Sequence, residues 1–448
     1  MKKIVFFFLL AALSVQAQYT IKGTMNPPGS YDWVILYKIE GAKQVFVQSG
    51  ALKKDAKGNQ FSFSLPTDSK TGMYRVTYKT EGKGFADFLF NKENIEFSFN
   101  PEKAEETISF TLSKENKLYQ RYIKTVSKNQ YKADSLQISF LKNPNEGLKT
   151  AYKNQLKKLA TMQNDYLKKS KGMMVQSFVK ATNRYNNPQL ASKPQTYLND
   201  VVTHFFDNIN FNNKDLYNST FLVDRITDYV FYMNYSDDPK IQKNLHKKAV
   251  TTVLNKATDP TFKKDVLEFL ITQFANYNNV EFADELLNTS YKKLPTPSQN
   301  TNFIKNYYEK TQVAVGRVAP EITWSENGKN YKLSTLSGAQ HYVLVFWSTG
   351  CSHCLREIPQ LNTFSKNIKK TKFIAFSLEE QATDWQQQIK ALTGWHHVLG
   401  LNKWEHPIAR TYQIYSTPTY IILDKNKRII AKPNTIENTK KIIEYLEQ

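Results

Sequence analysis

The sequence contains little cysteine, glycine or proline, and each scarcity excludes a class of protein. Two cysteines in 448 residues exclude a scaffold held together by several disulfides. Sixteen glycines and sixteen prolines exclude a collagen-like or low-complexity chain. Beyond residue 17, no stretch approaches the ~20 apolar residues that a membrane-spanning helix needs. We therefore expect globular domains.

Acidic residues are outnumbered by basic ones. The chain has 61 Lys and Arg against 40 Asp and Glu, a formal charge of +21. Such an excess fits nucleic acid, an anionic membrane face or acidic protein partners. The basic residues are scattered, however, with no run of five or more and no recognisable nucleic-acid-binding motif. We therefore expect a solvated basic surface and no nucleic-acid partner.

Residues 1–17 have the pattern of a secretory signal peptide. Two lysines precede the apolar run 4–15, and Val15-Gln16-Ala17 offers a cleavage site after Ala17. No cysteine follows the run, so a lipid anchor is not expected. These features predict export, to the periplasm of a Gram-negative bacterium, and a chain that is soluble after cleavage.

A length of 448 residues predicts two to four domains, and the pattern changes twice along the chain. Residues 113–312 repeat apolar side chains at helical spacing, interrupted by Asn-Pro and Asp-Pro steps, which predicts an α-helical region. Residues 18–112 contain short strand-like stretches separated by turn sequences, which predicts a sandwich-like antiparallel β domain; the stretches are 33–37, 61–65, 73–78, 85–90 and 95–99.

Residues 313–448 alternate strands with helices and predict an α/β domain. The continuous apolar run 342–346 is typical of a strand buried on both faces. Asn434 or Thr435 is a suitable N-cap for the last helix. The remaining strands are expected at 373–376, 419–423 and 428–431, and the helices at 355–370, 385–392 and 434–448. The fold class is thus multidomain: β, then α, then α/β.

Both cysteines of the chain lie in Cys351-Ser352-His353-Cys354, where the strand 342–346 gives way to a helix. The unpaired N–H groups and the positive dipole end of a helix favour a thiolate. Cys351 can then attack a disulfide, and Cys354 can resolve the mixed disulfide. In this context the pattern predicts a redox-active pair. Two inert buried thiols, or half of a metal site, are the alternatives.

The sequence around the pair resembles the thioredoxin fold and, more narrowly, the exported thiol–disulfide oxidoreductases of the TlpA/ResA group. Residues 346–354 (FWSTGCSHC) and the following Glu357-Ile358-Pro359 carry this likeness, which covers about 313–448. With this likeness we expect Cys351 as nucleophile and Cys354 as resolving thiol, and the exchange chemistry itself needs no cofactor or metal. The resemblance also implies thiol or disulfide client proteins and a membrane redox partner.

The same resemblance assigns roles to a loop and to the N-terminal region. Ser416-Thr417-Pro418 fits the loop whose cis proline faces the cysteine pair in this fold, so Thr417 and Pro418 would bind the client backbone. The β region is similar to the N-terminal β domains that precede thioredoxin-like modules in exported Bacteroidetes proteins.

Three further side chains are expected to tune the pair. A protonated His353 would stabilise the Cys351 thiolate and make the disulfide more oxidising; a solvent-exposed histidine without influence is the alternative. In the TlpA/ResA group a glutamate at the position of Glu357 affects ionisation or proton transfer, and a surface carboxylate is the alternative. Trp347 matches the tryptophan that flanks the site in thioredoxins, with pure packing as the alternative.

Two features leave the direction of the reaction open. Val345 stands where ordinary thioredoxins have a buried aspartate, so proton handling is left to Glu357, His353 or water. The family implies a reductase, whereas His353 and Thr417 resemble the corresponding residues of oxidising or isomerising members.

A module without enzymatic activity is the remaining interpretation. Its cysteines would bind copper. A Cys/His metal site with His396, His397 and His406 is a related alternative, although the adjacent His396 and His397 would point to opposite faces of a strand. The module's helical region would hold client proteins, although the aromatic residues around 205–231 are better explained as core. Oligomeric state stays open.

Overall fold

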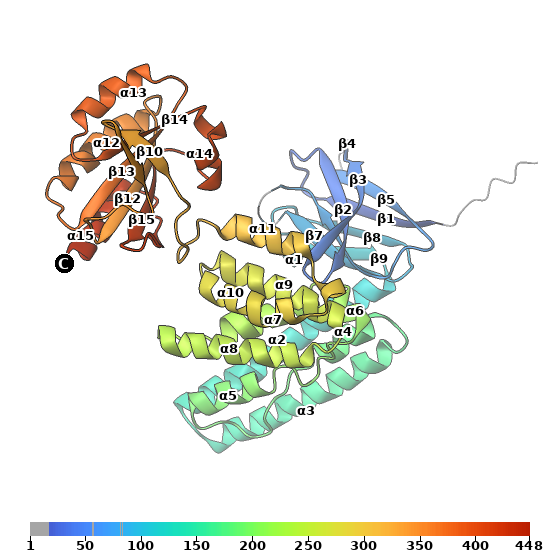
Figure 1. Ribbon diagram of the computed structural model, residues 1–448. Coiled ribbons are helices and arrows are strands. Elements are labelled where there is room, and N and C mark those ends of the chain that lie inside the picture. Colours follow the sequence, from blue (N-terminus) through green and yellow to red (C-terminus); the bar gives the residue numbers. More distant parts are fainter. Residues whose placement is uncertain (1–17, 56–57, 81, 83) are drawn as a thin grey trace, which may run out of the picture. The chain divides into compact units, whose positions relative to one another are not determined.

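The computed structural model describes residues 18–55, 58–80, 82 and 84–448 (Figure 1). The signal-peptide prediction for 1–17 lies outside these residues. By its contacts the chain divides into two units inside helix α9 (Pro260–Asn276), one ending at Val266 and one beginning at Leu267. The helical region therefore contributes to both units. No helix among the described residues has the length and apolar content to cross a membrane.

The first unit begins with two sheets that share one apolar core. In β5, Phe61, Phe63 and Leu65 alternate with exposed polar residues and point into this core, as the period of a strand requires. One sheet has the order β4-β5-β1-β8-β9 and the other β3-β2-β6-β7. The strands are β1 (Gln18–Met25), β2 (Trp33–Glu40), β3 (Lys43–Ala51), β4 (Lys53–Asp55), β5 (Gly58–Pro66), β6 (Gly72–Thr77), β7 (Phe85–Phe90), β8 (Ile95–Phe99) and β9 (Ser109–Leu112).

All five stretches expected in this region are strands, which confirms a β domain: β2, β5, β6, β7 and β8. The pairing is antiparallel with one exception, since β1 and β8 run parallel. A parallel neighbour is accessible here because the chain crosses to the other sheet and back between β1 and β8.

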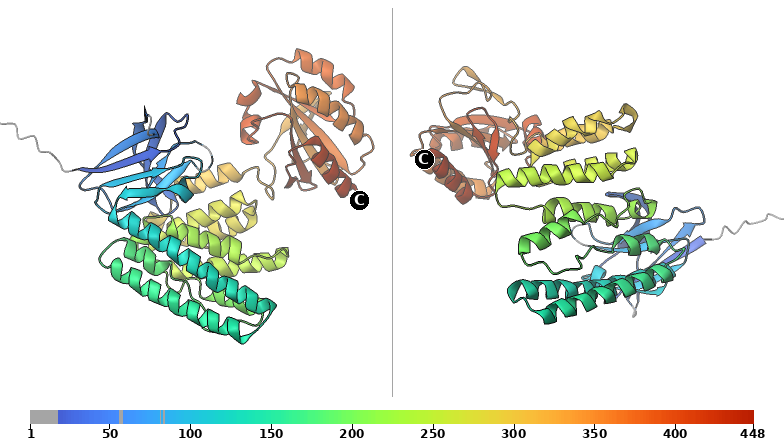
Figure 2. Two further views of the ribbon diagram at one scale, coloured as in Figure 1. Left: turned by 180° about the vertical axis from the view of Figure 1, so that it is seen from behind. Right: turned by 90° about the horizontal axis from the view of Figure 1, so that it is seen from below.

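After the short α1, the helices of the first unit continue with a long antiparallel pair, α2 and α3, which lie side by side in Figure 2. Asn143-Pro144 separates them, as expected of a breaker. The Tyr122 hydroxyl joins the pair by donating to Gln163 Oε1 at 2.8 Å. The helices before α9 are α1 (Ala104–Thr107), α2 (Lys114–Lys142), α3 (Glu146–Lys169), α4 (Val175–Ala181), α5 (Pro194–Thr203), α6 (Lys214–Tyr217), α7 (Phe221–Thr227), a π-helical turn (Asp228–Met233) and α8 (Pro239–Lys256).

The aromatic residues around 205–231 pack mainly against one another. Phe206 and Tyr229 are buried, with ring centroids 4.6 Å apart. Phe206 also contacts Phe211 at 5.1 Å. These contacts favour the core interpretation of the stripe over a client-binding one.

The second unit continues from α9 with α10 (Val280–Thr289) and α11 (Thr301–Thr311) and then forms an α/β domain around a five-stranded sheet of order β14-β13-β12-β15-β16. Strands β12, β13 and β14 are parallel, and β15 runs antiparallel to β12. The strands are β12 (His341–Trp347), β13 (Thr371–Glu379), β14 (His396–Leu401), β15 (Thr419–Asp424) and β16 (Ile429–Ala431), with a hairpin of β10 (Thr323–Glu326) and β11 (Lys329–Lys332).

Strand β12 is buried on both faces and divides the domain into two cores. Val343, Val345 and Trp347 join the core that also holds residues of α12 (Ser352–Ser365) and α15 (Ile436–Glu447). The alternate side chains join the opposite core, with α14 (Pro407–Thr411) and the β10–β11 hairpin. This layering explains the uninterrupted apolar run in the sequence. The N-cap prediction is confirmed for Thr435, whose hydroxyl accepts from Asn438 N–H at 3.2 Å.

The predicted helix boundaries differ from the observed ones at two places. Helix α12 covers Ser352–Ser365 rather than 355–370. It starts early because Cys351 is its N-cap. It ends early, at the point where the Ser365 hydroxyl donates a hydrogen bond to the Asn362 carbonyl oxygen at 2.7 Å. The helix expected at 385–392 is split into α13 (Thr383–Gln388) and a 3₁₀ turn (Ile389–Ala391).

Candidate active site

The cysteine pair lies at the carboxyl end of β12, where the buried strand meets the first turn of α12. Cys351 is the N-cap residue, and its Sγ accepts a hydrogen bond from Cys354 N–H at 3.2 Å. The sulfur thus takes the place of the oxygen of an ordinary N-cap side chain. Because the first N–H groups of the helix point toward Cys351, this position stabilises negative charge on its sulfur.

The two cysteines form a disulfide, with Cα atoms 5.2 Å apart. Their surroundings differ. Cys354 is fully buried in the core beside Ile358 and Leu361, whereas Cys351 is partly exposed. An external thiol can therefore reach Cys351, while Cys354 is accessible mainly from within the pair. This asymmetry matches the roles of nucleophile and resolving thiol that the sequence predicts.

The Ser416–Pro418 loop lies next to the pair. The Thr417–Pro418 peptide bond is cis, and the Thr417 carbonyl oxygen is 3.3 Å from Cys351 Sγ. In the dithiol form, the Cys351 S–H group can donate to this oxygen. The Thr417 carbonyl, 66 residues away in sequence, is thus brought to the Cys351 sulfur, and the cis Pro418 follows it directly.

His353 is exposed on the first turn of α12. Its position beside Cys354 in sequence is therefore compatible with both expectations, a tuning cation and a solvated side chain.

Glu357 is directed toward strand β15 and is largely buried. Its side chain is 20% exposed, and its carboxylate accepts a hydrogen bond from the Tyr420 hydroxyl at 3.1 Å. Burial, and then the neighbouring Glu357 carboxylate, raise the pKa of Tyr420 above its usual range. Tyr420 therefore stays protonated at neutral pH and remains a donor. Glu357 is not a freely solvated surface carboxylate, because Tyr420 restrains it.

Trp347 is 1% exposed and packs with Cys354, Ile358 and Leu361. Trp347 and the buried Cys354 are therefore part of the same apolar core. Val345, which stands where ordinary thioredoxins have an aspartate, is fully buried in the same core.

A buried carboxylate that the sequence reasoning missed lies on the neighbouring strand. Glu379 ends β13 and is 4% exposed, and it accepts the Thr349 N–H at 2.7 Å. The signal available in the sequence was an acidic residue shortly after the apolar run 373–376, separated from it only by Ser377 and Leu378. Parallel strands end at one edge of a sheet, so this residue had to fall near the end of β12.

The histidines considered as metal ligands have other partners. His396 Nδ1 is 2.8 Å from Glu326 Oε2, and His397 Nε2 is 2.7 Å from the Leu392 carbonyl oxygen. Burial lowers the pKa of both His397 and His406. Across the part of the chain that the structure describes, no group of three His, Cys, Asp or Glu side chains is arranged to hold a metal ion.

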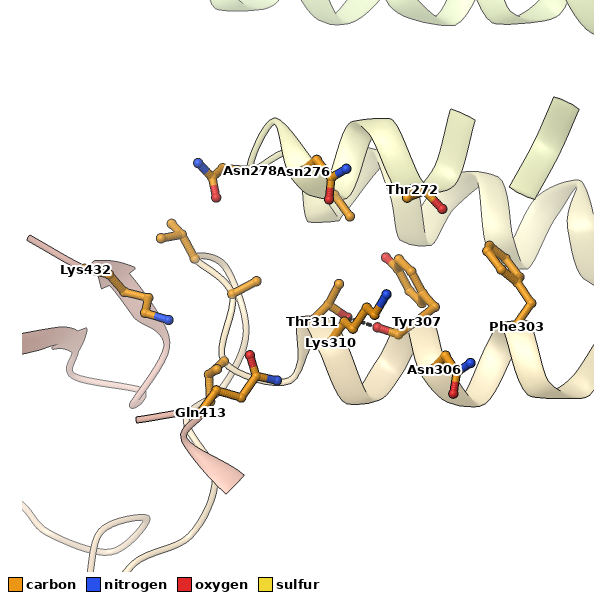
Figure 3. Close-up of a pocket in the computed structure, with 14 residues that line it drawn as sticks. Thr272, Asn276, Asn278, Phe303, Asn306, Tyr307, Lys310, Thr311, Gln413 and Lys432 are labelled. Atoms are coloured by element: carbon orange, nitrogen blue, oxygen red, sulfur yellow. Dashed lines mark hydrogen bonds between the residues drawn. The ribbon is translucent and has the colours of Figure 1, made fainter. Parts of the chain in front are cut away.

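A cavity of about 490 Å³ lies in the second unit, at a distance along the chain from the cysteine motif (Figure 3). Figure 3 shows Lys310, Gln413 and Lys432 around it, together with Asn and aromatic side chains of α9 and α11. None of the predicted site residues lines this cavity. The chemistry of the pair is therefore not housed there.

Comparison with known proteins supports the reading of the cysteine site. The thioredoxin-like family model matches residues 338–429, which include β12, the cysteine pair and the cis proline. The chain carries a TlpA/ResA-like thioredoxin domain. It is similar to the thiol–disulfide oxidoreductases ResA of Geobacillus kaustophilus and Geobacillus thermodenitrificans, 28% and 27% identical over 153 residues. These matches cover 33% of this chain and 84% and 86% of the ResA proteins.

A solved structure is also similar to part of this chain. It is the thioredoxin domain of a thiol–disulfide oxidoreductase from Bacteroides vulgatus, 27% identical, covering 30% of this chain and 99% of that one, with a TM-score of 0.28. The family match and the ResA relatives identify the protein as a disulfide oxidoreductase. The residues that match the thioredoxin-like family model make up under a third of the chain.

Proposed function

We propose that this protein is exported and that its Cys351–Cys354 pair reduces or exchanges disulfides in proteins of the bacterial envelope. The observation that carries the proposal is the unequal exposure of two bonded sulfurs at a helix start. Cys351 is reachable from solvent, and Cys354 is buried behind it. A client disulfide would meet one sulfur first and the other second.

The proposed reaction proceeds in two exchanges. The Cys351 thiolate attacks one sulfur of a client disulfide, which forms a mixed disulfide and releases one client thiolate. The Cys354 thiolate then attacks Cys351 Sγ, which releases the second client thiolate and forms the Cys351–Cys354 disulfide. Two electrons pass from the pair to the client. A dithiol donor must return them, and we propose a membrane redox partner for this step.

The loop at Thr417 is proposed to hold the client backbone. Its carbonyl oxygen is 3.3 Å from Cys351 Sγ, so a peptide paired with this loop would present its own disulfide at the nucleophile. Glu357 and His353 are proposed to influence the ionisation of the pair, and Trp347 to support it by packing. No cofactor is needed for these steps.

The direct test follows the reduction of insulin by dithiothreitol, which makes the insulin chains precipitate. The full-length protein should shorten the lag before turbidity, whereas C351S should behave as buffer alone. Gln360→Ala, a change at an exposed position of the same helix, serves as the control for folding. If C351S accelerates precipitation as well as the natural protein, the proposed function is wrong.

A second candidate, an oxidising or isomerising protein, is favoured by the exposed His353 directly before the buried cysteine. The reduction potential against glutathione buffers separates the two. A value near about −270 mV is that of a reductase, and a value of about −180 to −120 mV is that of an isomerase or oxidant.

Export is tested by the N-terminus of the mature protein. Cleavage after Ala17 would leave Gln18, the first residue of β1, as the first residue. N-terminal sequencing of the protein from a periplasmic fraction should therefore begin Gln-Tyr-Thr. A protein that starts at Met1 and stays in the cytoplasmic fraction would contradict export.

A further inference from the structure

Glu379 is a buried carboxylate beneath the turn that leads to the cysteine pair. Its Oε1 accepts from Thr349 N–H at 2.7 Å and from the Ser377 hydroxyl. Its Oε2 accepts from the Thr349 hydroxyl at 2.7 Å and from the Ser348 hydroxyl at 3.4 Å. Four donors surround two oxygens, an arrangement that suits the carboxylate anion, which only accepts. A fully hydrogen-bonded charge can be buried at this position, whereas an unpaired one could not.

The hydrogen bonds of Glu379 continue to Cys351 through the backbone. The Ser348 hydroxyl oxygen accepts from Gly350 N–H at 3.2 Å, and the Ser348 carbonyl accepts from Cys351 N–H at 3.2 Å. Glu379 thus anchors the residues that set where the nucleophilic sulfur lies. Thr349 and Cys351 are two positions apart, so their Cα atoms are separated by no more than about 7 Å.

We propose that Glu379 is a positioning residue that also sets the redox poise of the pair. It fixes the Ser348–Cys351 turn, and its negative charge raises the pKa of the Cys351 thiol and favours the disulfide over the dithiol. This inference rests on the proposed function of the pair. The sign follows from charge alone: a carboxylate near a thiol disfavours the thiolate, and loss of thiolate stabilisation makes the reduced form less stable.

Apart from Glu379 of β13, the charged groups near the cysteine pair lie outside that strand. On α12, His353 is exposed, Arg356 is exposed, and Glu357 is bonded to Tyr420 of β15. Glu380 follows Glu379 in sequence but is 73% exposed and pairs with Lys403 at 2.9 Å. Because water and salt screen Glu380, its charge acts on the pair far less than that of Glu379. Glu380 is therefore a matched control.

The reaction used to measure the poise is balanced with glutathione. The Cys351–Cys354 disulfide and two molecules of glutathione give the dithiol and one molecule of glutathione disulfide, a transfer of two electrons. The Cys351 thiol pKa is measured separately, from the pH dependence of alkylation by iodoacetamide in the reduced full-length protein. Its value does not depend on turnover of any client.

The test compares Glu379→Gln with Glu380→Gln. Glutamine has the shape of glutamate, and the hydroxyls of Ser348 and Thr349 can rotate to accept from its amide. We expect E379Q to lower the Cys351 pKa by about half a unit to one unit. The equilibrium should shift toward the dithiol by about three- to tenfold, where tenfold corresponds to about 30 mV. We expect E380Q to shift either quantity by less than about twofold.

Ser377→Ala provides a change of opposite sign. Ser377 lies on β13, and its hydroxyl donates to Glu379 without touching the turn before Cys351. Its removal leaves the carboxylate charge less neutralised, so the Cys351 pKa should rise and the disulfide should become more stable. A loosened turn would not produce opposite signs in E379Q and S377A.

Three outcomes overturn the inference: equal effects of E379Q and E380Q, a rise of the Cys351 pKa in E379Q, or shifts of the same sign in E379Q and S377A. If E379Q does not fold, S377A decides alone, since an unchanged or lowered pKa in that variant contradicts the proposal. Failure of the proposed function is distinct, because the natural protein would then show no reversible disulfide in glutathione buffers.

Discussion

Each of the two units buries a glutamate that holds backbone in place, but the surroundings of the two side chains differ. Glu115, in the first turn of α2, is 4% exposed. Its carboxylate accepts from Met174 N–H at 3.0 Å, Val175 N–H at 2.8 Å and the Asn91 amide at 2.7 Å. It ties the start of α4 to the turn after β7, and among its partners is no nucleophile.

Glu379 of the second unit is equally buried and accepts a backbone N–H in the same way. The backbone that it holds, however, ends at Cys351. The comparison shows that a buried carboxylate with all its hydrogen bonds made fixes the backbone around it. Such a carboxylate can influence a reaction only where that backbone carries a reactive group.

The largest expected effect is the trapping of client proteins by the cysteine pair, a reactivity that is proposed for the second unit and not for the first. Cys354→Ser should trap clients as stable mixed disulfides with Cys351, because no second sulfur remains to resolve them. Non-reducing gels and mass spectrometry of the reduced variant incubated with an oxidised client would reveal the adduct. Cys351→Ser should trap none, since the remaining Cys354 is buried. Equal trapping by both variants would contradict the assigned roles.

A change at Glu115 should affect stability and leave the redox chemistry alone. Glu115→Ala removes the acceptor of three buried or partly buried donors and should lower the free energy of unfolding by about 3 kcal/mol. The reduction potential should stay the same. Urea denaturation monitored by circular dichroism measures the first quantity. Glu146→Ala, in the exposed first turn of α3 with its side chain 84% exposed, should cost no more than about 0.5 kcal/mol.

A change at Glu357 should slow exchange without a comparable loss of stability. A positioned acid or base contributes about 10²- to 10⁴-fold. We expect Glu357→Gln to lower the second-order rate of insulin disulfide reduction by about tenfold, below that range because Tyr420 restrains the carboxylate. Stopped-flow fluorescence gives this rate. In Tyr420→Phe the Glu357 side chain remains and the tyrosine hydroxyl is lost, so the rate should change less. A larger effect in Y420F would place the function on the tyrosine.

The smallest expected effect is the pH dependence from His397. Burial lowers its pKa in the folded protein below the unfolded value of about 6.5. The unfolded chain therefore binds more protons as the pH falls below that value, so stability is full above it and decreases toward acid. The urea midpoint of the natural protein should drop more between pH 7.5 and 5.5 than that of His397→Gln. Parallel curves for the two proteins would show that His397 has no part in this dependence.

The sequence predicted those strands and helices whose burial produces a recognisable pattern of apolar residues. Strand β5 alternates core and solvent side chains, and β12 is apolar throughout because both of its faces are covered. Strand β3 was missed because Val45 and Phe46, adjacent residues, are both exposed, so no alternation marks it. An edge strand that is mostly exposed, with only Val47 and Gly50 partly buried, leaves too little hydrophobic pattern to detect.

The candidate site was predicted as far as its residues are close in sequence or match a motif. The cysteine spacing and Thr417-Pro418 were identified in this way. Glu379 was missed because its partners Ser348 and Thr349 are about 30 residues away and are reached only across the β12–β13 pairing, in which Trp347 lies opposite Ser377. Ordinary thioredoxins have their buried aspartate at the position of Val345 on β12, whereas the buried Glu379 of this protein lies on the adjacent strand β13.

By itself the sequence determined where a redox-active cysteine pair could form and which fold class holds it, because the two-residue spacing of the cysteines, a buried strand before them and a helix after them are local properties of the chain. Tertiary structure alone decided which sulfur is exposed, that Thr417 stands 3.3 Å from it, and that a buried carboxylate underlies the turn. These are contacts between strands distant in sequence, and they depend on the order and register of the sheet, which no local pattern specifies.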